Sequence, residues 1–211
     1  MAQLSGAEHR GTSPRVEIPR AYNAAHDLVE RNLTPARAGK VAYIDDAGRY
    51  TYAELAARVN RAANALVGLG LRMEERVMLA HLDTIDFPAV FLGAIKAGIV
   101  PIAVNTLLTA GDYAFMLDDS RATTLVVSEA LLPSFAPILA GRAFLRTVIV
   151  SGREAHGHLH LQALAGTASA SFAPAPTTCD DVCFWLYSSG STGTPKGTLH
   201  VHSSLIQTAE L

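Results

Sequence analysis

Residues 182–197, VCFWLYSSGSTGTPKG, decide the fold of this 211-residue chain. The first six are apolar or aromatic and predict a buried strand. The other ten contain five Ser or Thr, three Gly and one Lys, with no Asp or Glu. Glycines let a backbone turn so that successive N–H groups face one anion, while hydroxyls and a Lys charge add further donors. The stretch therefore predicts a strand followed by a loop that binds a polyphosphate.

Two other interpretations of this loop fit the residues less well. A flexible Gly/Ser linker would need neither a buried strand before it nor the ending Pro195-Lys196-Gly197. A phosphate-loop NTPase would need the order Gly-Lys-[Ser/Thr], but here Pro195 precedes Lys196 and Gly197 follows it. Binding of a polyphosphate by a different kind of loop is the remaining interpretation.

Strand-like and helix-like segments alternate ahead of the loop. We expect strands at residues 76–81, 99–104, 124–128 and 147–150, and helices at 86–97, 109–119 and 130–139. Such alternation predicts an α/β fold of parallel βα units with right-handed crossovers. Nearer the N-terminus we expect a helix at 21–32, a hairpin at 41–52, and a helix that Thr51 and Glu54 begin with a capping box.

The chain divides into four regions by composition. Residues 1–18 are polar and are expected to be a disordered leader, and residues 19–164 form a first α/β subdomain. Residues 165–178 are rich in Ala, Ser, Thr and Pro and are expected to be a linker or a surface excursion. Residues 179–211 begin the phosphate-loop region, with a returning strand at 198–201 and Ser203 as the N-cap of a further helix.

Composition and charge exclude several classes of protein. The net charge of −2 provides no basic surface for nucleic acid, and 49% hydrophobic residues can fill a core. The longest apolar run, residues 91–108, is interrupted by Lys96, Pro101 and Asn105, so no membrane span is expected. The two cysteines, Cys179 and Cys183, do not suggest a disulfide framework, which favours a reducing, cytoplasmic setting.

Histidines form two groups that deserve separate interpretation. His200 and His202 would share one face of a strand, and a partly buried pair is the expected arrangement. His156, His158 and His160 resemble a zinc cluster by number, but no Cys or carboxylate of matching spacing accompanies them. We therefore expect surface histidines there.

The loop pattern [Ser/Thr]-Ser-Gly-[Ser/Thr]-Thr-Gly-x-Pro-Lys-Gly is met in full from Ser188 to Gly197. It resembles the phosphate loop of the adenylate-forming acyl-CoA synthetase, or AMP-binding, superfamily. Residues 91–109 are similar to a second segment of these enzymes, through Gly93, Ala94, Ala97, Gly98 and Pro101. Residues 19–23, 104–109 and 209–211 resemble the benzoate–CoA ligase branch in particular. The resemblance covers roughly residues 20–211.

This resemblance implies an ATP-dependent aryl-acid–CoA ligase. Such enzymes join a carboxylate to ATP, giving an acyl-adenylate and diphosphate, and then exchange AMP for the thiol of coenzyme A. The implied partners are a small aromatic carboxylate such as benzoate, ATP, Mg²⁺ and coenzyme A. Oligomeric state is left open.

The resemblance also implies roles for individual residues. Lys196 would stabilise the leaving pyrophosphate, and Thr192 would lie near Mg²⁺ bound to ATP. His202 matches a histidine that follows the loop in the family, although Val201 and Thr198 replace the usual Thr and Val. The residues expected to bind ATP are Ser188, Ser189, Gly190, Ser191, Thr192, Gly193, Thr194, Lys196 and Gly197.

Members of the superfamily are more than twice as long as this chain. The remainder would carry the adenine and ribose motifs, most of the aryl pocket, and a mobile C-terminal domain with the adenylation lysine. We therefore expect an N-terminal portion of the large domain, incomplete and inactive alone. The alternatives are a ligase for another carboxylic acid, an adenylation domain that loads a carrier protein, and a non-catalytic nucleotide-binding module.

Overall fold

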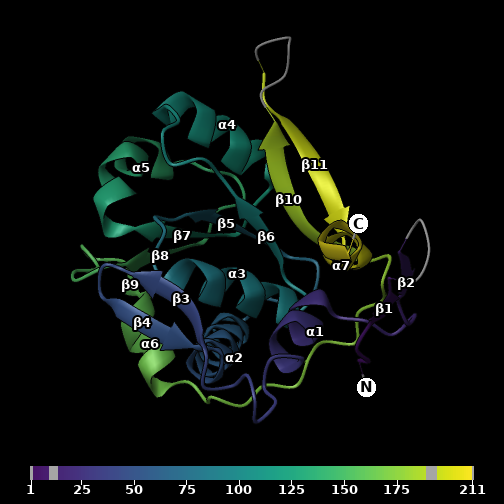
Figure 1. The fold of residues 1–211 in the computed structure, drawn as a ribbon. Coiled ribbons are helices and arrows are strands. Elements are labelled where there is room, and N and C mark those ends of the chain that lie inside the picture. The colour runs from purple at the N-terminus through teal and green to yellow at the C-terminus, as the bar shows by residue number, and fades with distance from the viewer. Residues whose placement is uncertain (1, 10–13, 189–193, 211) are drawn as a thin grey trace.

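A seven-stranded sheet forms the centre of the molecule (Figure 1). The computed structural model describes residues 2–9, 14–188 and 194–210. The strand order is β11-β10-β6-β5-β7-β8-β9, and neighbours run parallel except for the antiparallel pair β10–β11. These strands are β5 (Arg76–Ala80), β6 (Val100–Ala103), β7 (Thr124–Ser128), β8 (Thr147–Ser151), β9 (Leu159–His160), β10 (Val182–Ser188) and β11 (Lys196–Val201).

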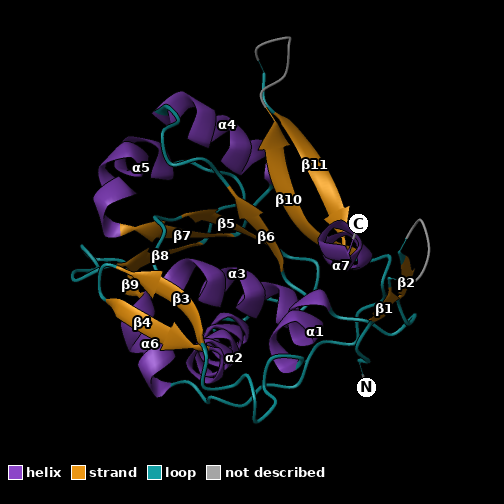
Figure 2. Ribbon diagram, in the orientation of Figure 1, coloured by secondary structure: helices purple, strands orange, loops and turns teal. Residues whose placement is uncertain are grey.

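Helices cover both faces of this sheet (Figure 2). One face carries α1 (Ala24–Glu30), α2 (Tyr52–Gly68), α3 (Asp86–Lys96) and α6 (Leu161–Thr167). The other carries α4 (Ala110–Ser120) and α5 (Leu132–Leu139), the latter preceded by the 3₁₀ turn η1 (Glu129–Leu131). The last helix, α7 (His202–Glu210), follows β11 directly. The predicted α/β fold with parallel βα units is confirmed.

The central strand β5 shows how one strand serves two cores. Val77 and Leu79 belong to the core beneath α2 and α3, whereas Met78 and Ala80 belong to the core beneath α4 and α5. Successive side chains of a strand point to opposite faces, so a strand covered on both sides needs apolar residues throughout. This explains why Val77 to Ala80 of β5 are all apolar rather than alternately apolar and polar.

Two helices begin with reciprocal caps. The Thr51 hydroxyl accepts from the Glu54 amide, and the Glu54 carboxylate accepts from the Thr51 amide at 2.7 Å, as predicted. Thr109 and Asp112 make the same arrangement at the start of α4. Each box satisfies two backbone donors that a helix N-terminus otherwise leaves unpaired.

The N-terminal segment differs from the expected disordered leader. Its described residues include a two-stranded ribbon of β1 (Gly6–Glu8) and β2 (Arg15–Glu17). The Ser5 amide donates to the buried carboxylate of Asp27 on α1, which also accepts from the Tyr22 hydroxyl at 2.8 Å. A buried carboxylate needs such donors, and they fix this segment against the first helix.

Residues 165–178 are held closely against α2 rather than forming a free linker. The segment begins inside α6 and then runs extended. Its backbone carbonyls accept from α2: Asn60 donates to Ala170 at 2.8 Å, and Asn64 donates to Ser169 and Ser171 at 2.9 Å. Beyond it, β10 pairs with β6 and with β11, so the hairpin β10–β11 extends the same sheet.

A second hairpin, β3 (Val41–Asp45) and β4 (Gly48–Thr51), lies outside the main sheet and was predicted from the turn residues between its strands. Within the described residues, no helix combines the length and the apolar character that crossing a membrane requires.

Candidate functional site

The stem of the predicted phosphate loop is the antiparallel hairpin β10–β11. The register places Ser188 opposite Lys196 at its outer end and Tyr187 opposite Gly197. Thr194 and Lys196 are exposed. The other predicted binding residues of the loop, Ser189, Gly190, Ser191, Thr192 and Gly193, lie outside the described residues.

Two contacts hold the stem in place. β10 pairs with β6 through Trp185 and Leu186, which joins the hairpin to the parallel sheet. The Tyr187 hydroxyl donates to Asp119 Oδ2, near the end of α4, at 2.6 Å. Burial and this hydrogen bond both raise the pKa of Tyr187, so the hydroxyl stays protonated and available as a donor. The end of β10 is therefore fixed just before the loop begins.

Gly197 on β11 lies against two aromatic side chains of β10. A Cβ at this position would come within 3.4 Å of the Trp185 ring and 3.6 Å of the Tyr187 ring. Both rings belong to β10, and Gly197 lies across from them on β11. These distances are ordinary van der Waals contacts, so both aromatic side chains lie over the β11 backbone next to Lys196.

His202 is buried at the opposite end of β11 from Lys196. It is the first residue of α7 and 1% exposed, and its Nδ1 accepts from the Ala24 amide of α1 at 3.0 Å. Burial lowers its pKa to about 4, against a smaller opposing effect of Asp181. Six residues of strand span roughly 20 Å, so His202 and Lys196 do not converge on one phosphate. The neutral ring instead joins α1 to α7.

Two expectations for this region are wrong. His200 and His202 do not share a strand face, because the strand ends at Val201 and His202 is helical. His200 instead stacks on Phe184 with ring centroids 4.5 Å apart. Ser203 is not an N-cap, because the helix begins one residue earlier; its amide donates to the Cys179 carbonyl at 2.9 Å.

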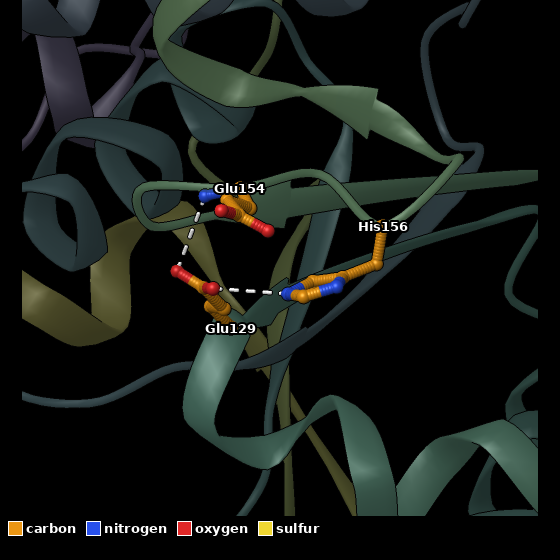
Figure 3. Close-up of side chains that lie close together, drawn as sticks. All are labelled: Glu129, Glu154 and His156. Carbon is orange, nitrogen blue, oxygen red and sulfur yellow. Dashed lines mark hydrogen bonds and ion pairs between the residues drawn. The ribbon is translucent and has the colours of Figure 1, made fainter.

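Glu129, Glu154 and His156 form a small cluster that the sequence did not reveal (Figure 3). His156 Nε2 lies 2.9 Å from Glu129 Oε1, while Glu129 Oε2 accepts from the Arg153 amide at 2.7 Å. The hydrogen bond with His156 is the largest cause of the lowered pKa of Glu129. Both carboxylate oxygens of Glu129 thus have protein partners, and these hydrogen bonds join η1 to the loop after β8.

The three histidines at positions 156, 158 and 160 do not come together. His160 Nε2 contacts the Gly152 carbonyl at 2.9 Å, whereas His156 contacts Glu129. His158 is exposed. His156 and His160 therefore have separate partners, and His160 is half-buried.

A crevice of about 1180 Å³ lies at the carboxyl ends of β5, β7 and β8. Ligands of open α/β sheets commonly bind at such strand ends, where successive crossovers leave toward opposite faces. Here α3 follows β5 on one face and α5 follows β7 on the other. Polar residues follow each of these strands in the sequence, but only the strand order brings them together. It is lined in part by Asp45, Tyr50, Arg58, Asp86, Ser128 and Ser151.

Comparison with known proteins decides the family. A model of the AMP-binding enzyme family matches residues 30–211. The chain belongs to this family. It is 58% identical over its whole length to a benzoate–CoA ligase of Thauera aromatica, of which it covers 40%. It is 45% identical, over 88% of its length, to a 4-hydroxybenzoate–CoA/benzoate–CoA ligase of Rhodopseudomonas palustris, of which it covers 34%.

Solved structures of the AMP-binding family agree in fold. An anthranilate CoA ligase in complex with anthranoyl-AMP matches with a TM-score of 0.88 and 34% identity, over 92% of this chain and 37% of that one. A benzoate CoA ligase from Burkholderia xenovorans matches with a TM-score of 0.80 and 43% identity, over 90% and 36%. The chain thus spans about two fifths of its relatives, which agrees with the prediction of an N-terminal portion of an aryl-acid–CoA ligase.

Proposed function

We propose that this chain is the N-terminal portion of an ATP-dependent ligase that converts benzoate, or a simply substituted benzoate, into its CoA thioester. The observation that carries the proposal is the 58% identity to the Thauera aromatica benzoate–CoA ligase along the whole chain. In the first step the carboxylate attacks the α-phosphorus of ATP, giving the acyl-adenylate and diphosphate. In the second step the thiol of coenzyme A attacks the acyl carbon and AMP leaves.

The role proposed for the β10–β11 hairpin is to hold the triphosphate of ATP. Ser188 and Lys196 face each other at the end of the stem, next to the hydroxyl- and glycine-rich residues 189–194. The ammonium group of Lys196 would offset the negative charge that builds up on diphosphate as the α-phosphorus–oxygen bond breaks. Mg²⁺ bound to the ATP oxygens would share this charge, with Thr192 as the nearest proposed hydroxyl.

His202 is proposed to act in folding rather than in the reaction. Its Nδ1 is occupied by the Ala24 amide, and its depressed pKa keeps the ring neutral near pH 7.

The two cysteines are free thiols, which fits the proposed reducing, cytoplasmic setting. No step of the proposed reaction requires them.

A chimera tests the proposed activity. Residues 1–211 replace the segment that they match in the Thauera aromatica ligase, and carboxylate-dependent ATP–pyrophosphate exchange is measured across a panel of aromatic and fatty acids. We expect exchange with benzoate, and no benzoyl-CoA synthesis by residues 1–211 alone. Because the host ligase supplies most of the aryl pocket, the chimera tests whether residues 1–211 can serve in benzoate activation, and a folded chimera without benzoate-dependent exchange would contradict the proposal. Benzoyl-CoA formed by the 211-residue chain would contradict the expectation that its synthesis needs the part of the ligase that these residues do not match.

A further inference from the structure

An apolar hollow of about 380 Å³ lies between three helices on one side of the sheet, outside the proposed phosphate loop. Its floor comes from the small side chains of α2 and α3, together with Leu161 of α6. On α2 the contributing positions follow helical spacing, so they form one continuous face. The hollow is formed wholly by residues 54–166, and its volume falls in the range of small-molecule sites. Its apolar lining consists of Ala57, Ala62, Ala89, Val90, Leu161 and Ala165.

Arg58 stands where this hollow meets the crevice at the strand ends, because it lines both. Its guanidinium carbon lies 4.9 Å from the centroid of the Tyr50 ring. Its Nη1 is 3.8 Å from Asp86, which is beyond hydrogen-bonding distance, and its side chain is 43% exposed. Among the described residues, Asp86 is the one carboxylate within 4 Å of the Arg58 guanidinium, and Glu54, four residues earlier on α2, also interacts with its charge.

The other charged groups at the rim are already engaged. The Asp86 carboxylate accepts from Ser151 at 2.8 Å and from Gln162 at 2.7 Å. Glu54 belongs to the capping box of α2. Arg61 donates to backbone carbonyls of the segment after α6, reaching Ala168 at 2.8 Å. A ligand entering the hollow therefore meets an apolar floor and the Arg58 guanidinium, whose nearest carboxylate, Asp86, makes its hydrogen bonds to other side chains.

We propose that this hollow binds a small carboxylate that carries an apolar, ring-sized body. The carboxylate would form a charge-assisted, bidentate contact with Arg58, whose planar fork matches its two oxygens. The body would lie against Ala62, Val90 and Leu161, which are already buried. The apolar surface removed from water would therefore be that of the ligand and of the half-buried Ala57 and Ala165. The inference follows from the lining of the hollow and does not depend on the proposed ligase activity.

Methyl-resolved NMR of the 211-residue chain tests this site. Alanine, valine and leucine methyl groups are labelled, and benzoate is titrated against the chain. We expect saturable shifts at Ala57, Ala62, Val90 and Leu161, with a dissociation constant on the order of 1 mM for so small a ligand. Acetate, which lacks the apolar body, and benzamide, which lacks the charge, should each bind about fivefold more weakly or worse.

Matched variants separate the two parts of the proposal. Arg58→Gln should weaken benzoate binding about fivefold, while Arg49→Gln, at an exposed site on β4, should not. Ala57→Leu should fill the hollow and abolish the shifts, while Ala163→Leu, at an exposed position of α6, should preserve them. Equal binding by Arg58→Gln, shifts confined to other methyl groups, or no shift at all would overturn the proposal.

Discussion

Burial decides what the histidines of this chain can do. His158 is exposed, whereas His202 is buried and uses its ring nitrogen to accept a backbone hydrogen bond from α1. A charged imidazole could not accept that bond, and its charge would be removed from water. The same residue type is therefore a solvated group at one site and a structural connection at another.

The His202 pKa predicts how stability depends on pH. Its folded pKa is about 4, whereas the unfolded chain returns it to 6.5, so the unfolded state takes up the proton first as pH falls. The stabilisation is fully present above pH 6.5 and is lost between pH 6.5 and 4. Urea unfolding at pH 7 and pH 5 should show wild type losing about 2 kcal/mol more than His202→Asn.

His158→Asn is the control for this experiment. Because His158 is exposed, its replacement should leave the pH dependence as in the wild type. Identical losses in wild type and His202→Asn between the two pH values would contradict the assigned role of His202.

At the scale of elements, the contact between α2 and α3 depends on a glycine. A Cβ at Gly93 would meet the Val59 carbonyl oxygen at 2.8 Å and the Ala62 Cβ at 2.9 Å. These neighbours are backbone and a short side chain, so they can give way only if the helices move apart. The segment containing Gly93 resembled the family in sequence, and the structure supplies the physical reason for its glycine.

Gly93→Ala should therefore destabilise the chain by about 1–3 kcal/mol through overpacking. Gly68→Ala is the matched control, because Gly68 ends α2 and its Cβ would meet nothing within 4 Å. Alanine there should be neutral or stabilise by up to about 1 kcal/mol. Thermal or urea unfolding distinguishes the two variants, and equal stabilities would refute the close-contact argument.

The hydrogen bond between the hairpin stem and α4 leads to a further prediction. If the Tyr187 hydroxyl and Asp119 stabilise the stem through their mutual hydrogen bond, Tyr187→Phe and Asp119→Ala should each lower the free energy of unfolding by about 1 kcal/mol. The double variant should lose little more than either single one, giving a coupling energy of about 1 kcal/mol. Fully additive losses would mean that the two residues act separately.

Sequence periodicity found the long elements and missed the short ones. β5 to β8 and their helices were predicted because each is an apolar run or a helical face bounded by Gly, Pro or a cap. β9 has two residues and α6 has seven, too few for a period to emerge. The end of β11 at Val201 was predicted, but the start of α7 was placed too late for another reason: His202 is fixed by α1, 178 positions away in sequence, and no local signal reports that contact.

At the scale of the whole molecule, one sheet joins the regions that composition had divided. The strand order β10-β6-β5 brings the loop-bearing hairpin beside strands that precede it by about a hundred residues, as β10 and β6 pair in parallel. The phosphate loop could be proposed from the sequence because its residue types are local in sequence, and its binding role stays a prediction. The crevice and the adjoining apolar hollow could not, since helices and strands from residues 44 to 166 have to pack before they exist.

The most direct test of the account is the role of Lys196 in benzoate-dependent ATP–pyrophosphate exchange by the chimera with the Thauera aromatica ligase. Lys196 lies exposed at the end of the stem, so its removal should leave the melting temperature unchanged. We predict that Lys196→Ala lowers the exchange rate about 100-fold and that Lys196→Arg retains part of it. Undiminished exchange by a folded Lys196→Ala chimera would contradict the claim that this hairpin holds the leaving diphosphate.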